Sequence, residues 1–314
     1  MTPSADRTLA AALLILGYAT VIGFTDNFVR VIAVEGGLWQ FHALRSAMVV
    51  IMIGGLAAMV GLRLVPNRPR AVLARSLIHG CAMLIYFGAL AFLPVAQVAA
   101  GLFTAPIFVL LISRLVYGHP IGPVRVAAVA VGFIGVVLVL GPEALAGASL
   151  AAGLPVAAGV LYALGNIATR EWCAGESAVV LTGGFFAVLG LLGLVGMAVL
   201  AVLPLPVADG AAGFVTRGWV TPSGTFLVWT TVQAAGSMIG VGMMVRAYQI
   251  AEASRVSVFE YVILPASAIW AWLIWSEVLT PLAMAGMAMI TLAGLMIAAR
   301  ARQVSVPSPV AARQ

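Results

Sequence analysis

Acidic and basic side chains stand inside long apolar stretches of this chain, where they are costly unless water or a partner surrounds them. Asp26 and Arg30 are four residues apart and share one helical face, and Trp39, His42 and Arg45 follow in the next stretch. The spacing predicts an ion pair of Asp26 with Arg30 or Arg45. Such a pair is either a buried structural contact, or a contact that acts as a gate or binds substrate on the outer side of the membrane.

A second acid, Glu260, lies in a later apolar stretch, about 10 Å from its start at 1.5 Å per residue. Arg255 stands near the same end, and an ion pair between Glu260 and an arginine is our hypothesis for an inner gate. Proton coupling needs a titrating group, and Asp26, His79 and Glu260 are the candidates. Facilitated diffusion is equally compatible with the sequence.

His79, Met83 and Tyr86 form one stripe on a single helical face, at spacings of four and three residues. The stripe lines a cavity, senses protons through its histidine, or is purely structural, and the spacing leaves these readings open. Other stretches carry similar mixtures of amide, hydroxyl and aromatic groups, which suit either an amphipathic solute or close helix packing. These complete the candidate cavity set: Gln97, Thr104, Tyr162, Asn166, Trp229, Gln233 and Tyr261.

Membrane-spanning helices must position these side chains. The chain of 314 residues is 63% hydrophobic and 8% charged, with a mean hydropathy of +1.14, which excludes an ordinary soluble domain. A helix needs about 20 apolar residues to cross a bilayer, and proline- and glycine-containing breakers divide the chain into segments of that length. We predict an all-α polytopic membrane protein with ten transmembrane helices, at 8–31, 38–62, 71–93, 95–117, 122–141, 150–170, 177–203, 223–247, 254–276 and 281–300.

The basic residues indicate how the helices are oriented. All 16 are arginines, and if the N-terminus is cytoplasmic, only Arg30, Arg45 and Arg217 fall on the outer side. This bias follows the positive-inside rule and predicts that both termini are cytoplasmic, in a bacterial-type inner membrane. The net charge of +6 then reflects contact with anionic lipid headgroups rather than with nucleic acid.

A weak internal repeat relates residues 89–136 to residues 247–295 and aligns Pro106 with Pro265. Two halves of five helices have opposite orientations because five is odd, so we predict a 5+5 inverted-topology repeat. The predicted units are an N-terminal repeat at 1–143, a C-terminal repeat at 144–302 and a disordered cytoplasmic tail at 303–314.

Short segments near both ends of the chain carry a further pattern. They read GFTDNFVRVIA and FHALRS early in the chain, and AYQIAEASRVSVFEYVILP, WSEVLTP and LAGLMI late in it. Together with the repeat, these segments resemble the drug/metabolite transporter superfamily, EamA type, over almost the whole chain. His119 departs from the family pattern, which usually has a glutamate at that position.

The resemblance implies a secondary transporter that works by alternating access, with helices 1–4 and 6–9 around a central cavity and helices 5 and 10 bracing them. Families of this kind carry aromatic amino acids (the YddG-type exporters), other metabolites, riboflavin or cationic drugs. The aromatic and amide-rich candidates favour export of aromatic or other apolar amino acids. The alternatives are efflux of lipophilic cationic drugs, which an unpaired acid in the cavity would favour, and a non-transporting membrane partner or sensor protein.

Motifs that other chemistries require are absent from the sequence. It contains no GxxxxGKS phosphate loop, no HExxH and no GxSxG. We therefore expect no enzyme activity, no cofactor and no metal site. The expected partners are a small-molecule substrate and membrane lipids, without nucleic acid, and a monomer is compatible with the sequence.

Overall fold

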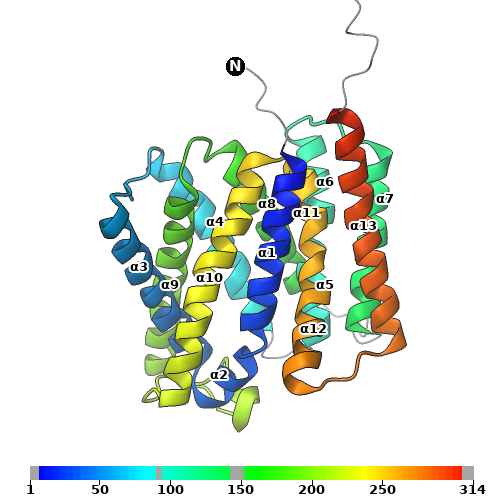
Figure 1. The fold of residues 1–314 in the computed structure, drawn as a ribbon. Helices are drawn as coiled ribbons and strands as arrows, with labels where there is room; N and C mark the ends of the chain where they lie inside the picture. Colours follow the sequence, from blue (N-terminus) through cyan, green and yellow to red (C-terminus); the bar gives the residue numbers. More distant parts are fainter. Residues whose placement is uncertain (1–6, 90–92, 94, 142–150, 152, 306–314) are drawn as a thin grey trace, which may run out of the picture.

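The computed structural model shows a bundle of helices that stand side by side (Figure 1). It describes residues 7–89, 93, 95–141, 151 and 153–305. Its helices are α1 (Thr8–Asp26), α2 (Val29–Glu35), α3 (Leu38–Val60), α4 (Pro69–Ala89), α5 (Val95–Leu102), α6 (Ala105–Leu115), α7 (Pro123–Leu140), α8 (Gly153–Glu171), α9 (Ala178–Val202), α10 (Gly224–Ile250), α11 (Ala253–Phe259), α12 (Ile263–Trp275) and α13 (Pro281–Ser305), with the 3-10 turns η3 (Gly210–Gly213) and η4 (Glu260–Val262).

Nine stretches of the described chain are long and apolar enough to cross a membrane. Three of these stretches are interrupted, and each consists of two consecutive helices. These pairs are α1 with α2, α5 with α6, and α11 with α12. The remaining long helix, α8, packs along α4 within the same bundle (Figure 1). The all-helical polytopic fold predicted from the sequence is confirmed.

The first predicted helix, at 8–31, is broken in the structure. After Asp26 the Asn27 side chain donates to the Gly23 carbonyl at 2.7 Å and to the Ser267 carbonyl at 3.2 Å. An asparagine that bonds the carbonyl four residues earlier competes with the helical ladder. The chain therefore starts a second helix, α2, and anchors the break to α12.

Two further breaks coincide with prolines. Pro106 stands in the first turn of α6, and Pro265 follows η4 in the first turn of α12. A proline has no N–H to bond the carbonyl four residues earlier, so the preceding helix ends nearby. These are the two prolines that the internal repeat aligns. Broken helices in membrane proteins frequently mark ion and substrate sites.

The helices α7 and α13 lie together at one edge of the bundle (Figure 1). They cross where Gly135 meets Gly286, and a Cβ added to Gly286 would lie 2.6 Å from the Gly135 carbonyl oxygen. Glycine at this crossing therefore sets how closely the two helices approach. The helix α13 continues to Ser305, and residues 306–314 of the predicted tail lie outside the described part.

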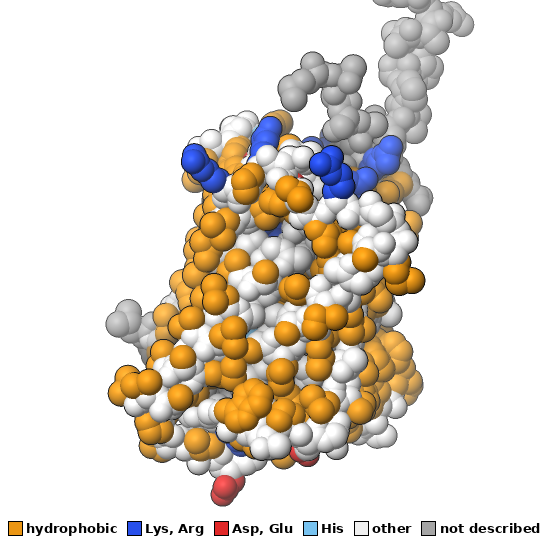
Figure 2. Space-filling view, turned by 90° about the vertical axis from the view of Figure 1, so that its left-hand side faces the viewer, with side chains coloured by type: hydrophobic (Ala, Val, Ile, Leu, Met, Phe, Trp, Pro, Cys, Tyr) orange, Lys and Arg blue, Asp and Glu red, His pale blue; other side chains and the backbone are white. Residues whose placement is uncertain are grey.

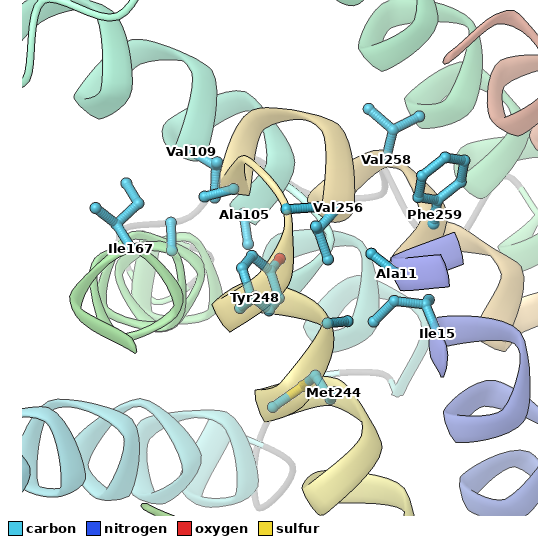
Figure 3. Close-up of a cluster of buried hydrophobic side chains, with 14 of the residues drawn as sticks. Ala11, Ile15, Ala105, Val109, Ile167, Met244, Tyr248, Val256, Val258 and Phe259 are labelled. Carbon is cyan, nitrogen blue, oxygen red and sulfur yellow. The ribbon is translucent and has the colours of Figure 1, made fainter. Parts of the chain in front are cut away.

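Charged side chains gather at the two ends of the bundle. Figure 2 shows arginines grouped at the end that carries the start of α1, and acidic side chains at the other end. We call the first the arginine-rich end. A cluster of buried apolar side chains fills the bundle there, with Ile15 from α1, Val109 from α6, Met244 and Tyr248 from α10, and Val256 from α11 (Figure 3).

Candidate functional site

The acid Glu260 lies at the start of η4, where the α11–α12 rod is interrupted, and its side chain is only 5% exposed. Its carboxylate accepts hydrogen bonds from the hydroxyls of Tyr248 at 3.0 Å and Tyr162 at 3.1 Å, and from the Asn166 amide at 3.5 Å. All three donors are neutral. A buried carboxylate with only neutral donors can bind a proton or the cationic group of a ligand.

The donors converge because of their spacing. Tyr162 and Asn166 are four residues apart on α8 and so share one face of that helix. Tyr248 lies one turn beyond Met244 on α10, and the Met244 sulfur lies 3.0 Å from the Tyr162 hydroxyl oxygen. A 3-10 turn often marks a functional hinge in a helix, and here it presents Glu260 to both partner helices.

His79 extends this centre toward α4. Its Nε2 lies 3.0 Å from the Asn166 Oδ1, and the ring contacts Tyr162 and Phe185 edge to face. Because the Asn166 amide donates to Glu260, its oxygen is left to accept from His79. A Cβ added to Gly165 would lie 2.3 Å from the His79 Nδ1, so only glycine lets the ring lie against α8. His79, Asn166 and Glu260 thus form one hydrogen-bonded chain.

Asp26, the acid at the end of α1, does not form the predicted ion pair with Arg30. Asp26 accepts a hydrogen bond from the Gln233 amide at 2.8 Å, and Arg30 pairs with Glu277 at 2.6 Å. The expectation failed because the helix breaks after Asp26, so that Arg30 belongs to α2 and no longer shares its face. The Asp26 side chain is accessible to water, although many protein atoms surround it.

Arg45 is buried, at 8% exposure, and forms no ion pair within the described chain, but its charge interacts with that of Asp26, the other pairing that the sequence predicts. One guanidinium nitrogen lies 3.1 Å from His42 Nδ1, the group stacks over the Phe41 and Phe186 rings, and its Nε has no hydrogen-bond partner. Trp39 donates to the Val215 carbonyl at 2.9 Å and so holds α3 to the segment before α10. Trp39 is an anchor in this structure.

Aromatic side chains lie between the two acids. Trp229 stacks on Phe28 with ring centroids 3.6 Å apart, and Tyr86 lies within electrostatic reach of Asp26. Tyr18 interacts with Tyr162 and with the charges of both Glu260 and Asp26. Sequence reasoning missed Tyr18, although a tyrosine in a predicted membrane-spanning helix was a usable signal.

Several predicted cavity residues lie outside this centre. Tyr261 is fully buried against α7, where a Cβ added to Gly132 would lie 2.4 Å from its ring, and its hydroxyl is within reach of the Glu260 charge but makes no hydrogen bond within the described chain. Thr104 bonds the Gly101 carbonyl at 2.6 Å. Met83 packs against a separate apolar cluster, and Gln97 is partly buried on α5. In the part of the chain that the structure describes, no three His, Cys, Asp or Glu side chains gather as a metal site.

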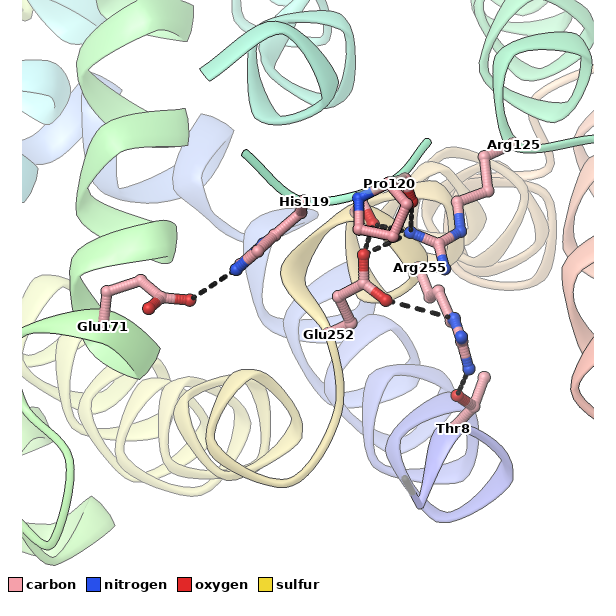
Figure 4. A network of polar contacts seen from close by, with 8 residues as sticks. Thr8, His119, Pro120, Arg125, Glu171, Glu252 and Arg255 are labelled. Carbon is pink, nitrogen blue, oxygen red and sulfur yellow. Dashed lines mark hydrogen bonds and ion pairs between the residues drawn. The ribbon is translucent and has the colours of Figure 1, made fainter. Parts of the chain in front are cut away.

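The predicted Glu260–arginine pair is also wrong. Arg255 instead pairs with Glu252 at 3.5 Å and donates to the Thr8 hydroxyl at 3.2 Å, while Arg125 binds the other Glu252 oxygen (Figure 4). Glu252 stands between α10 and α11, at the arginine-rich end. The network therefore ties α1, α7 and α11 together there and leaves Glu260 unpaired.

This network gives a pH-dependent contribution to stability. Burial raises the pKa of Glu252, but the hydrogen bonds from Ser254 and Arg125 and the charges of Arg125 and Arg255 outweigh it and lower the pKa below its ordinary value. A lowered pKa stabilises the fold above the unfolded value, and this is lost as pH falls through the folded value. We expect thermal unfolding of the purified protein to show Glu252→Gln less stable than wild type at pH 7, with the difference vanishing in acid. A difference that grows in acid would contradict the pairing.

Comparisons with known proteins agree with this architecture. The EamA-like transporter family matches residues 9–141. A riboflavin transporter of Rhizobium johnstonii is 26% identical over 240 residues, covering 76% of this chain and 72% of that protein. The pseudopaline exporter CntI of Pseudomonas aeruginosa is 27% identical over 251 residues, covering 79% and 82%. A crystal structure at 18% identity superposes with a TM-score of 0.74, over 95% of this chain and all of the other, and shows the same fold.

Proposed function

Because residues 9–141 are an EamA-family domain of the drug/metabolite transporter superfamily, we propose that this chain is a secondary exporter of small amphipathic metabolites, with aromatic or other apolar amino acids as its first candidates. Its named relatives are a riboflavin transporter and a pseudopaline exporter. Both names fit the class of small metabolites. The names of these relatives do not identify the substrate of this chain, so we infer it from the residues of the site.

The observation that carries the proposal is the unpaired Glu260. A carboxylate held by Tyr162, Tyr248 and Asn166, without a described cation, suits the ammonium group of an amino acid or a proton. Exchange of one for the other at the same carboxylate would couple export to proton entry. The three neutral donors keep the carboxylate oriented in either state.

The apolar part of the substrate would lie among the aromatic side chains. Tyr18 lies near both acids, and Tyr86 and Trp229 present partly exposed rings toward the end where Asp26 is exposed. Such rings offer flat apolar surface and cation–π contact with an ammonium group, worth about 0.5–2 kcal/mol. An aromatic amino acid would use both properties.

Alternating access is supported by the way the two halves pack. The helix α1 packs on α10 of the other half, and in the same way α8 packs on α4. The helix α7 packs on α13, its counterpart in the repeat. We infer two inverted units, 1–143 and 144–302, that rock against each other. The apolar cluster seals the arginine-rich end, which we assign to the cytoplasm, while the exposed Asp26 opens to the outside.

A second candidate function rests on the same observation. An unpaired acid also suits lipophilic cationic drugs, which carry no carboxylate. Solute counterflow in liposomes decides between the candidates, using L-phenylalanine, L-leucine and a cationic dye, with and without a pH gradient. We expect exchange of phenylalanine. Exchange of the dye alone would support drug efflux, and exchange of no solute would support a non-transporting role.

A further inference from the structure

A hollow of about 350 Å³ opens at the arginine-rich end, where α8 and α10 finish. Its lining includes Arg170 and Thr169 at the end of α8, Glu176 before α9, and Arg246 and Gln249 at the end of α10. The hollow shares no lining residue with the Glu252 network. Its lining carries charge but forms no ion pair among the described residues.

Two arginines and one acid line this hollow, so their formal charges sum to one positive charge. Both carboxylate oxygens of Glu176 accept backbone N–H groups, from Asn67 at 3.1 Å and from Arg68, so this acid is held by the loop before α4. The Arg246 guanidinium donates to Gln249 at 3.4 Å, a neutral and long contact. Two arginines against one acid match a single negative charge on a ligand.

A third arginine lies directly beneath the hollow. Arg75 on α4 is 1% exposed, and it donates to the Thr169 hydroxyl and to the Leu181 carbonyl, both at 3.0 Å. It has no acidic partner among the described residues, and it lies within electrostatic reach of Tyr162. A buried arginine without an acid is costly, and an anion that approaches it from the hollow would offset that cost.

One face of α8 connects the hollow to Glu260. Thr169, Asn166 and Tyr162 follow at spacings of three and four residues, so they line up along the helix. Thr169 is in the hollow, and Tyr162 and Asn166 bind Glu260. Seven residues of helix span about 10 Å, which is the length of an amino acid with a long side chain.

We propose that this hollow is the cytoplasmic loading site and that it recognises the carboxylate of a monoanionic or zwitterionic metabolite. Arg170 and Arg246 bind the carboxylate first, and Arg75 attracts it inward along α8. The inference rests on the proposed export function and narrows it, because a substrate must then carry a carboxylate in addition to the ammonium group that Glu260 binds. Purely cationic drugs lack the group that this site selects.

The test uses equilibrium binding to the purified full chain in lipid nanodiscs, with three probes that share a phenyl ring. These are 3-phenylpropionate as the anion, L-phenylalanine as the zwitterion and 2-phenylethylamine as the cation. We expect Arg170→Gln/Arg246→Gln to weaken binding of the anion at least tenfold and to leave binding of the amine unchanged. The matched control is Arg63→Gln/Arg114→Gln, which removes two exposed arginines at the same end, outside the hollow.

The outcomes separate this inference from the proposed function. Equal loss in both double variants, no loss in either, or no binding of 3-phenylpropionate to wild type would overturn the loading site. Tighter binding of phenyl phosphate than of 3-phenylpropionate would also overturn it, in favour of a phosphate. If Glu260→Gln keeps full amine binding while the arginine variant loses the anion, the loading site stands and the role of Glu260 falls.

Discussion

Replacing Glu260 with glutamine is expected to reduce transport by on the order of 100-fold while the protein stays folded. Glutamine keeps the size of the side chain, and its one carbonyl oxygen can still accept from either Tyr162 or Tyr248, which bond different oxygens of Glu260. It removes the charge that binds the ammonium group of the substrate, and a lost buried charge contact costs about 3 kcal/mol. Each 1.4 kcal/mol is about tenfold. Counterflow of the solute that wild type exchanges is the measurement.

Glu277→Gln is the matched control for this experiment. Glu277 is half exposed at the end opposite the arginine-rich end, and its partner is Arg30. Exposed ion pairs contribute about 0–1 kcal/mol, so transport by this variant is expected to stay within twofold of wild type. Wild-type exchange by Glu260→Gln, or an equal loss in both variants, would remove Glu260 from the transport site.

The second large effect concerns stability, at the bond between His79 and Asn166. Asn166→Leu leaves the buried His79 Nε2 without its partner, and it removes one of the two donors to the Glu260 oxygen that Tyr248 also bonds. An orphaned buried group costs about 1–3 kcal/mol, and a lost hydrogen bond to a charged group costs about 1.5–3 kcal/mol. We therefore expect this variant to lose about 2–4 kcal/mol of unfolding free energy, measured by thermal or denaturant unfolding in detergent.

A double-mutant cycle separates this bond from general damage to the core. His79→Leu alone also breaks the contact, and in the double variant no partner at this bond is left orphaned. The two losses are then expected to be non-additive by about 0.5–3 kcal/mol. Strict additivity would mean that the two side chains do not interact, and the relay from His79 to Glu260 would be withdrawn.

Sequence spacing anticipated the centre of the candidate site, because helical periodicity reports which side chains share a face. Tyr162 and Asn166 were predicted from their spacing on one helix, and the structure brings them to Glu260. His79 was predicted from the cost of a polar group in an apolar stretch. Periodicity says nothing of which helices meet, so the bonds that join these residues across α4, α8 and η4 could not be predicted.

Charge pairing was where sequence reasoning failed. Arg30 was one of two arginines proposed for Asp26, on the assumption of one continuous helix, but the Asn27 side chain replaces a backbone bond and ends α1. An arginine was proposed for Glu260, yet Arg255 pairs with Glu252, which is nearer along the chain. Arg75 was counted only as a topology signal, and its burial beneath the hollow depends on contacts with α8 and α9.

The central claim is that substrate and proton meet at the Glu260 carboxylate. Dicyclohexylcarbodiimide modifies protonated carboxyl groups in apolar surroundings, and mass spectrometry identifies the modified residue. We predict modification of Glu260 that stops transport and is slowed by the solute that wild type exchanges in counterflow. Complete modification of Glu260 with transport intact, or no protection by that solute, would contradict the account.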